Sequence, residues 1–453
     1  MEVKNVKGTK DVYGKEVNGF QYVESVMRAV SELYGFEELR TPVIEHSEVF
    51  VRGVGEGSDV VRKEMYTFLD KGGRSLTMRP EFTAGIIRSI VQNKFYATRD
   101  LPLKFYYSGP VFRYERPQLG RYRQFNQFGV ELVGQNSAQT DAEIIILGYM
   151  ILKTLGFENL TLKINTLGDD SSRDEYKHAL KDFFSQHIDN MCSDCKSRFE
   201  LNPLRILDCK VPEDKEIVKH APKINEYLSE EARNRFEYVC SILEYMEIPF
   251  EVDDTLVRGL DYYSETVFEF HYTSSKGQNY GAIGAGGHYD KLVKEFGGPD
   301  LHGVGFSFGI ERVVSVMTDD ELLQDDANPL INYIIPISED QHIPALALAT
   351  ALRVEGFKTE ICYDGTKLGT MVKKAVKKNA KFALIIGEDE VENNAVVIKT
   401  LETGEQETVE FKDIIDYIDT KLGNDEHHCE CGCCDDEEHH EDHCCCGRHK
   451  KEN

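Results

Sequence analysis

The sequence predicts an α+β fold in which an antiparallel sheet is flanked by helices and carries a helical insertion, followed by a C-terminal α/β domain. Residues 102–113 and 125–133 each have the pattern of a strand, and the polar, arginine-rich segment between them predicts a long antiparallel hairpin. Residues 171–246 turn helical and charged, as an insertion between two halves of a sheet would. From about residue 330, short strands alternate with helices, which indicates a mixed or parallel sheet.

Apolar spacing justifies the remaining elements of the first 322 residues. Phe20, Val23 and Met27 fall on one side of a helix over residues 16–34, and Pro42 begins an extended segment. The other predicted elements are, in chain order, an apolar helix at 140–156, a strand at 162–168, short strands at 265–272 and 280–285, and a helix near 309–318. Because the strands come in sets rather than alternating with helices, this part does not resemble a Rossmann sheet.

An acidic stretch at 319–329 predicts a linker to a second domain over residues 330–422. Within that domain we expect strands at 333–337, 358–363, 382–387, 395–400 and 407–411, and helices at 341–355, 367–379 and 412–422. Residues 423–453 form a tail that is nearly devoid of apolar side chains. Since such a segment cannot build a core, we expect it to be disordered without ligand.

Composition and charge limit the classes to which the chain can belong. No run of 18 or more apolar residues appears, and the N-terminus lacks the apolar stretch of a secretory signal, so we expect a cytoplasmic protein with no membrane partner. The formal net charge of −26 argues against indiscriminate binding to polyanions, although local clusters of Arg and Lys can still bind a nucleic acid. Disulfides are not expected, so the 12 cysteines should bind metal or remain free thiols.

Three arginine-containing motifs indicate a site for a phosphate-bearing ligand. Arg113 stands where the predicted hairpin opens, Arg258 lies in Arg-Gly-Leu-Asp-Tyr-Tyr, and Arg312 opens the helix that follows Gly-Phe-Ser-Phe-Gly. A guanidinium group stays charged and binds phosphate oxygens in pairs. Phe125, at the far end of the hairpin, offers a ring for stacking on a base. A lone Arg is more often a solvated ion pair, but three inside three motifs favour a functional role.

Together these motifs resemble the ATP and amino-acid sites of class II aminoacyl-tRNA synthetases, and the hexapeptide at 258–263 is similar to that of bacterial histidyl-tRNA synthetases. The resemblance covers residues 1–422. It implies a class II catalytic domain at 1–322, with the helical insertion at about 171–246, and an anticodon-binding domain at 330–422. It also implies a homodimer, whose interface is built from the segment between Pro42 and Glu56.

The resemblance implies an ATP-dependent histidine–tRNA ligase that uses Mg²⁺. Such an enzyme joins L-histidine to ATP as histidyl-adenylate, releases pyrophosphate, and transfers histidine to the 3′ end of its cognate histidine tRNA.

The residues implied to perform this chemistry fall into three groups. Arg113 and Arg258 are the expected catalytic residues, and they bind ATP together with Phe125 and Arg312. The expected histidine-binding residues are Glu81, Thr83, Gln127, Glu131, Tyr262, Tyr263 and Tyr289. A loop that meets the acceptor end of the tRNA is expected to use Arg116, Gln118, Arg121 and Arg123. A single Tyr is more often a core residue, but the adjacent pair after Arg-Gly-Leu-Asp favours recognition of the imidazole nitrogens.

Two features leave alternatives open. His288 stands where the family usually has Arg before the Tyr of Gly-Gly-Arg-Tyr-Asp, which puts the positioning of Tyr289 in question. The basic helix at 367–379 could follow tRNA phosphates or be a solvated helix face. Its lysines are Lys367, Lys373, Lys374, Lys377 and Lys378.

Cysteines and histidines suggest metal binding in two places. In the tail, seven Cys and six His predict binding of soft or borderline cations such as Zn²⁺, Cu⁺ or Ni²⁺, by one ion or by several. The candidate ligands there are Cys429, Cys431, Cys433, Cys434, His443, Cys444, Cys445 and Cys446. In the insertion, Cys192, Cys195 and Cys209 raise the idea of zinc, but one Cys-x-x-Cys without a second pair is a weak signal.

Two other functions compete with the ligase hypothesis. One is the non-catalytic regulatory paralogue that assists the first enzyme of histidine biosynthesis, which generally lacks the anticodon domain and has degraded motifs, both of which are intact here. The other is a metal-binding protein on a synthetase scaffold that has lost ligase activity, a reading that only His288 favours.

Overall fold

The computed structural model describes residues 3–55, 57–116, 122–323, 329–364 and 367–423. The chain divides into two compact units, Met1–Asp325 and Asp326–Asn453. Among the described residues, none of the helices combines the length and the apolar character needed to cross a lipid bilayer.

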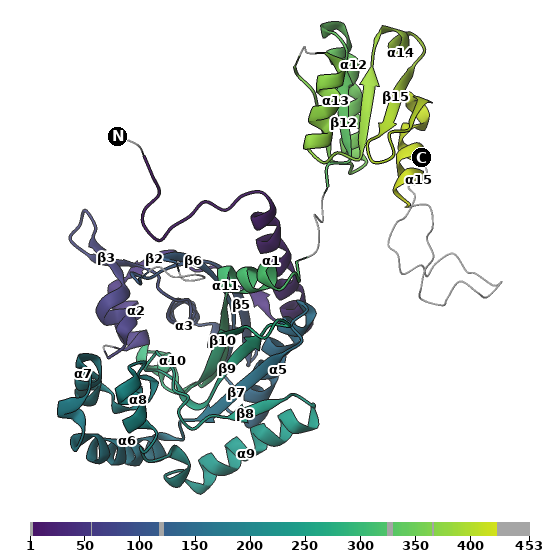
Figure 1. The fold of residues 1–453 in the computed structure, drawn as a ribbon. Coiled ribbons are helices and arrows are strands. Elements are labelled where there is room, and N and C mark those ends of the chain that lie inside the picture. The colour runs from purple at the N-terminus through teal and green to yellow at the C-terminus, as the bar shows by residue number, and fades with distance from the viewer. Residues whose placement is uncertain (1–2, 56, 117–121, 324–328, 365–366, 424–453) are drawn as a thin grey trace. The chain divides into compact units, whose positions relative to one another are not determined.

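An eight-stranded sheet forms the centre of the first unit (Figure 1). Its order is β1-β5-β6-β11-β10-β9-β7-β8, and every neighbouring pair from β5 to β7 is antiparallel, whereas the two edge pairs are parallel. The predicted antiparallel sheet and the hairpin of β5 and β6 are therefore confirmed. The strands are β1 (Glu37–Glu38), β5 (Leu103–Phe112), β6 (Gln124–Val133), β7 (Leu160–Thr166), β8 (Phe250–Val252), β9 (Ser264–Thr273), β10 (Asn279–Tyr289) and β11 (Gly303–Gly309).

Four helices cover one face of this sheet: α1 (Lys15–Leu33), α5 (Ala138–Thr154), α9 (Glu230–Tyr245) and α11 (Ile310–Asp319). Phe20, Val23 and Met27 of α1 are buried there, as the apolar spacing predicts. Ser137 caps α5 by accepting a hydrogen bond from the backbone N–H of Thr140 at 3.2 Å. The opposite face is covered mainly by α3 (Thr83–Gln92) and the short α10 (Leu292–Glu295), and it carries the cavity described below.

Residues 44–78 contain a small sheet and two helical segments. The sequence pattern predicts only that the chain is extended after Pro42. A small antiparallel sheet pairs β4 (Ser75–Met78) with β2 (Ile44–His46) and β3 (Tyr66–Leu69). Between β2 and β3 lie α2 (Ser47–Val54) and a single π-helical turn, η1 (Val60–Glu64). The short α4 (Phe95–Thr98) follows α3.

The insertion is helical, as predicted, but it splits between two cores. The segments α6 (Asp170–Ser185), η2 (Ile188–Asn190), α7 (Ser193–Leu201), η3 (Pro203–Asp208), α8 (Pro212–Val218) and η4 (Ile224–Glu226) enclose a core of their own. The last helix, α9, instead packs on α5 and joins the core of the main sheet through Phe236, Val239 and Leu243. Figure 1 shows α6, α7 and α8 gathered at one end of the unit while α9 runs along the sheet.

The second unit is a five-stranded mixed sheet in the order β13-β12-β14-β15-β16. Its first three strands are parallel and the remaining pairs antiparallel. Helices α12 and α15 cover one face and α13 the other. The elements are β12 (Asn332–Pro336), η5 (Glu339–Gln341), α12 (His342–Val354), β13 (Thr359–Ile361), α13 (Leu368–Lys377), β14 (Phe382–Ile386), α14 (Glu388–Glu392), β15 (Ala395–Thr400), β16 (Gln406–Glu410), η6 (Phe411–Asp413) and α15 (Ile414–Leu422).

Candidate active site

A cavity of about 690 Å³ opens on the face of the eight-stranded sheet that α3 and α10 cover. Strands β6, β10 and β11 form its floor, and the loop at 257–263 closes one side. All the residues predicted to bind ATP or histidine line it: Glu81, Thr83, Arg113, Phe125, Gln127, Glu131, Arg258, Tyr262, Tyr263, Tyr289 and Arg312. Side chains from segments more than 200 residues apart thus share one space, and their individual roles stay predictions.

Glu131 lies at the buried end of the cavity, on β6. Three hydroxyl groups donate to its carboxylate: Thr83 Oγ1 at 2.6 Å, Tyr107 at 3.3 Å and Tyr289 at 2.9 Å. Burial nevertheless raises the pKa of Glu131 to about 8, because the three hydrogen bonds offset only part of the desolvation cost. Near neutral pH this group therefore holds a proton in the ligand-free protein and can offer either a donor or an acceptor to a ligand.

Glu81 lies where α3 begins. The backbone N–H groups of Thr83 and Ala84 donate to its carboxylate at 2.7 and 2.9 Å, which satisfies two of the donors that a helix leaves unpaired at its start. Burial raises the pKa of Glu81, while the same hydrogen bonds and the charge of Arg113 oppose the rise. The residue thus combines a structural role at the helix start with a carboxylate facing the cavity.

The three predicted phosphate-binding arginines are each held by a contact within the cavity wall. Arg113 Nε donates to the backbone oxygen of Pro80 at 2.8 Å, and its guanidinium lies 5.4 Å from the centre of the Phe125 ring. Arg258 pairs with Glu269 of β9, and Arg312 donates to the backbone oxygen of Tyr280. These contacts hold three cations around one space, which is an arrangement suited to a polyphosphate.

Glycines of β11 allow the sheet floor to pack tightly under the buried carboxylate. A Cβ on Gly305 would lie 2.1 Å from Glu131 Oε2, and one on Gly303 would lie 2.3 Å from the Tyr289 ring. Glu131 and Tyr289 can occupy their positions only because these two strand residues have no side chain.

His288 lies beneath the floor of the cavity, not in it. On β10 it precedes Tyr289, and successive residues of a strand point to opposite faces, so its ring is fully buried among acidic groups. Nδ1 lies 2.8 Å from Asp141 and Nε2 lies 3.1 Å from Asp290. Burial alone would lower the pKa of His288, but these two carboxylates outweigh it and raise the pKa to about 9. The imidazolium therefore carries the positive charge that the family's usual Arg would carry at this position.

The predicted acceptor-end loop is described only in part. Arg123 Nε donates to the backbone oxygen of Glu115 at 3.3 Å, and its guanidinium lies 3.8 Å from the centre of the Tyr114 ring. Arg116 is exposed. Gln118 and Arg121 lie outside the described residues, and so do all the candidate metal ligands of the tail, from Cys429 to Cys446.

Sequence reasoning missed several residues of the cavity wall. Tyr107 stacks on Phe82 with ring centres 4.4 Å apart and reaches Glu131, but in the sequence it is one Tyr in an apolar strand. The insertion contributes Arg198 and Arg205, which bind Asp59 at 3.1 and 3.0 Å. No local pattern connects these residues, because they meet only through the fold.

Comparison with known proteins identifies both units. Residues 8–313 match the family model described as histidyl-tRNA synthetase, and residues 332–421 match the model described as anticodon binding domain. The chain is 45% identical over 416 residues to a histidine–tRNA ligase of Lactiplantibacillus plantarum, covering 91% of this chain and 98% of that protein. It is 43% identical over 407 residues to a histidine–tRNA ligase of Thermosipho melanesiensis, covering 90% and 96%.

Solved structures agree with this result. The crystal structure of apo histidyl-tRNA synthetase from S. aureus matches with a TM-score of 0.78 at 35% identity, covering 92% of this chain and 100% of that one. A structure from Bacillus halodurans, titled as an ATP phosphoribosyltransferase regulatory subunit/histidyl-tRNA synthetase, matches with a TM-score of 0.62 at 22% identity, covering 85% and 99%. At that identity it shows the fold alone.

Proposed function

The chain belongs to the histidyl-tRNA synthetase family, and from this premise we propose that it is a histidine–tRNA ligase that works in two steps. In the first step a carboxylate oxygen of L-histidine attacks the α-phosphorus of ATP, the bond to the β-phosphate oxygen breaks, and pyrophosphate leaves. In the second step a hydroxyl group at the 3′ end of the cognate tRNA attacks the adenylate carbonyl, and AMP leaves.

This proposal rests on one observation: side chains that can pair with an imidazole ring and arginines that can bind phosphate line the same cavity. Glu131 and the tyrosine hydroxyls at its buried end can pair with both nitrogens of an imidazole ring, and a site of that kind rejects side chains that lack such groups. Arg113, Arg258 and Arg312 surround the rest of the same space. The place suited to the histidine side chain therefore lies next to the place suited to the phosphates of ATP, and adenylate formation requires the two substrates to be neighbours.

Catalysis of the first step is then mainly electrostatic. Negative charge accumulates on the oxygens of the α-phosphate as the new bond forms. Positioned guanidinium groups stabilise this transition-state charge more strongly than they stabilise the charge on the bound substrates. We assign this role to Arg113 and Arg258. Phe125 and Arg312 are assigned to the adenine and the outer phosphates, and Glu81, Thr83 and Gln127 to the ammonium group of histidine.

Mg²⁺ fits the donor groups of the cavity. Glu64 and Glu115 line it, and carboxylate oxygens combined with phosphate oxygens and water are the ligands that Mg²⁺ prefers. When bound, the ion neutralises part of the phosphate charge and orients the leaving pyrophosphate.

The partners follow from the family and from three parts of the chain. We propose that Arg116, Gln118, Arg121 and Arg123 meet the acceptor end of the tRNA and that the second unit binds its anticodon. The segment from Pro42 to Glu56 is proposed to form a homodimer interface, which would cover such exposed apolar residues as Ile44.

We place the protein in the cytoplasm. The Cys/His-rich tail is proposed to bind Zn²⁺, Cu⁺ or Ni²⁺, on the strength of its seven Cys and six His.

Histidine-dependent exchange of labelled pyrophosphate into ATP tests the function directly. We expect exchange with histidine and none with the other amino acids. Arg258→Ala should lower the exchange rate by about 100-fold or more, because one positioned charge is lost from the transition state. Arg233→Ala is the matched control, since Arg233 is exposed on α9 and its side chain donates only to the backbone oxygen of Asn225 among the described hydrogen bonds.

The result also separates the competing functions. A folded protein without histidine-dependent exchange would favour the regulatory or metal-binding alternatives over the ligase. Normal exchange by Arg258→Ala would refute the role assigned to that residue without affecting the family assignment.

A further inference from the structure

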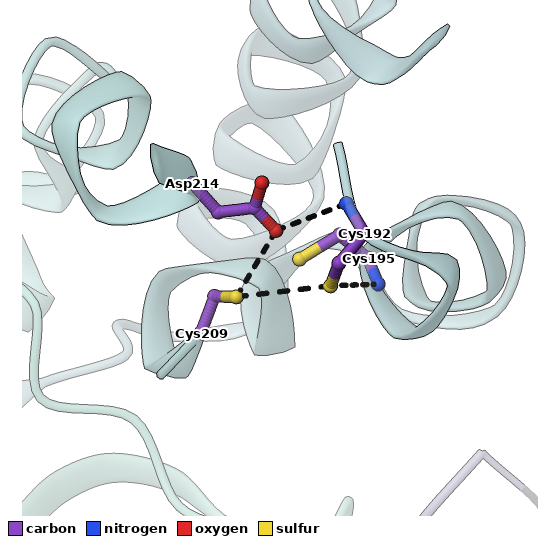
Figure 2. Close-up of side chains that lie close together, drawn as sticks. All are labelled: Cys192, Cys195, Cys209 and Asp214. Atoms are coloured by element: carbon purple, nitrogen blue, oxygen red, sulfur yellow. Dashed lines mark hydrogen bonds between the residues drawn. The ribbon is translucent and has the colours of Figure 1, made fainter. Parts of the chain in front are cut away.

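Four potential metal ligands meet inside the insertion, and none of the four is among the described residues that line the cavity. Cys192 is the residue before α7, Cys195 lies in its first turn, Cys209 follows η3, and Asp214 lies in α8. Their three sulfur atoms and one carboxylate oxygen all lie within 4.8 Å of one another (Figure 2). The sequence marks the cysteines, but only the fold adds the carboxylate that completes a set of four.

The spacing of these atoms suits a tetrahedral ion. A tetrahedral Zn²⁺ with bonds of about 2.3 Å to sulfur and about 2.1 Å to oxygen holds its ligand atoms roughly 3.5–3.8 Å apart. Here the sulfurs of Cys192 and Cys209 are 3.9 Å apart, and the sulfur of Cys209 lies 3.2 Å from Asp214 Oδ2. Small rotations of these side chains would bring all four atoms to bonding distance.

The candidate ligands are mostly buried, and hydrogen bonds hold two of them in place. Cys195, Cys209 and Asp214 are 0%, 3% and 2% exposed, in the core that α6, α7, η3 and α8 share. The backbone N–H of Cys195 donates to the sulfur of Cys192 at 3.4 Å, and the N–H of Cys192 donates to Asp214 at 3.2 Å. Hydrogen bonds of this kind orient metal ligands and stabilise their charged forms.

Without an ion, the cluster places a carboxylate against thiols inside an apolar core. Asp214 Oδ2 lies 3.2 Å from the sulfur of Cys209 and accepts a hydrogen bond from the backbone N–H of Cys192 at 3.2 Å. A divalent cation bound there would take the place of the thiol protons and neutralise the carboxylate.

We propose that Cys192, Cys195, Cys209 and Asp214 bind one Zn²⁺ ion as a structural site of the insertion. Thiolate sulfur selects Zn²⁺ over hard cations, and the carboxylate favours it over Cu⁺, which prefers sulfur alone. Four protein ligands leave no open position for a substrate, which is typical of a structural site. The proposal does not rest on the ligase chemistry.

Such an ion would fix the wall of the cavity that the insertion supplies. It would join α7, η3 and α8, the first two of which carry Arg198 and Arg205 to Asp59 and to the cavity. Loss of the ion should therefore loosen this wall while the eight-stranded sheet, whose core is separate, stays folded.

The experiment uses the full-length chain with the seven tail cysteines replaced by Ser, so that thiolate binding can come only from the folded part. After purification and dialysis, we expect about one Zn²⁺ per chain by elemental analysis. Replacement by Co²⁺ should give the absorption of a tetrahedral cobalt thiolate, a signal that the tail histidines cannot produce. Cys195→Ser and Cys209→Ser should each lose the bound ion and the signal, and Asp214→Asn should weaken Co²⁺ binding about 10-fold or more.

The matched control is Cys240→Ser, because Cys240 is also a free, half-buried cysteine but lies on α9, outside the cluster. It should keep both the ion and the cobalt signal. The absence of a cobalt thiolate signal in the parent protein would overturn the proposal, whatever the variants do. A disulfide between Cys192 and Cys209, found by mass spectrometry of the unreduced parent, would overturn it as well.

Discussion

At the scale of single residues, the buried charges of the site are the features that experiment can measure most directly. Glu131 and His288 both have raised pKa values, but for opposite reasons: the carboxyl lacks a cation, and the imidazolium has two anions. Each makes the stability or the affinity of the protein depend on pH in a defined window.

Glu131→Gln should raise KM for histidine in pyrophosphate exchange by about 2- to 10-fold, because the amide cannot replace the hydrogen bond of the protonated carboxyl group and such a bond is worth about 0.5–1.5 kcal/mol. It should also change the pH dependence of stability. The folded pKa of Glu131 is raised to about 8, so its contribution is fully present below the unfolded value near 4.5 and is lost as pH rises through about 8. Urea unfolding should therefore show that wild type loses more stability than the variant across that window.

Glu158→Gln is the control for this change, because Glu158 is mostly exposed and pairs only with Lys153 among its described contacts. An unchanged KM in Glu131→Gln would remove Glu131 from the histidine-binding group.

His288→Gln should destabilise the folded protein by about 3–5 kcal/mol, because Asp141 and Asp290 lose their shared cation inside the core. The folded pKa of His288 is raised to about 9, so the stability it contributes is fully present below the unfolded value near 6.5 and disappears as pH rises through about 9. Denaturation at pH 6 and at pH 9.5 checks this, and the two proteins should differ far less at the higher pH.

The charged or titratable groups around His288 are Asp141, Asp290, Glu265, Arg235 and His302, so the comparison variant must keep the cation. His288→Arg does so, and its stability should lose the part of the pH dependence between 6.5 and 9 that His288 contributes, while the part that Glu131 contributes remains. An equal gap between wild type and His288→Gln at both pH values would show that the ring contributes packing and not charge.

At the scale of elements, helix α13 has one face buried against the sheet and another face that is exposed and basic. Met371 and Ala375 face the sheet core, and Lys373 and Lys377, each two residues further on, are exposed. Lys374 and Lys378 pair with Asp364 and Glu360. This geometry favours Lys373 and Lys377 as the lysines available to tRNA phosphates.

Lys373→Ala combined with Lys377→Ala should raise KM for tRNA about three- to tenfold. It should also make the slope of log affinity against log salt concentration shallower by about two, because about two phosphate contacts are lost. Pyrophosphate exchange needs no tRNA, so it should not change. The double variant Lys412→Ala with Lys421→Ala is the control, since both lysines lie elsewhere in the same unit and pair with glutamates. If both double variants behave alike, the basic face of α13 is only a solvated surface.

At the scale of the whole molecule, the family matches cover the two folded units and leave the tail outside them. The histidyl-tRNA synthetase match spans residues 8–313 and the anticodon-binding match spans residues 332–421, so the Cys/His-rich residues 423–453 lie beyond both.

Deletion of residues 425–453 should leave aminoacylation within about twofold of the full chain, because the residues predicted to bind ATP and histidine all lie between Glu81 and Arg312. Bound metal should fall to the single equivalent that we assign to Cys192, Cys195, Cys209 and Asp214. Charging of tRNA and elemental analysis of the two proteins measure these effects. A large loss of charging would mean that the tail takes part in the reaction or in tRNA binding.

Much of the fold could be predicted from the sequence because helix and strand periods are local properties. The pairing of β5 with β6, the helical insertion and the mixed second sheet follow from apolar spacing and turn residues. The stretch at 44–78 could not be predicted this way, because its strands of three or four residues are too short to show a period.

The sequence alone determined which side chains are predicted to carry the chemistry: the arginines of three motifs, Glu131 and the tyrosines that follow Arg258. Only the tertiary structure decided where these side chains lie and which groups surround them. It placed His288 under the cavity with two carboxylates, brought Tyr107 to Glu131, and added Asp214 to three cysteines. The physical reason is that a motif needs only neighbours along the chain, whereas burial, pKa and the closing of a ligand set depend on groups that meet only when separate elements pack together.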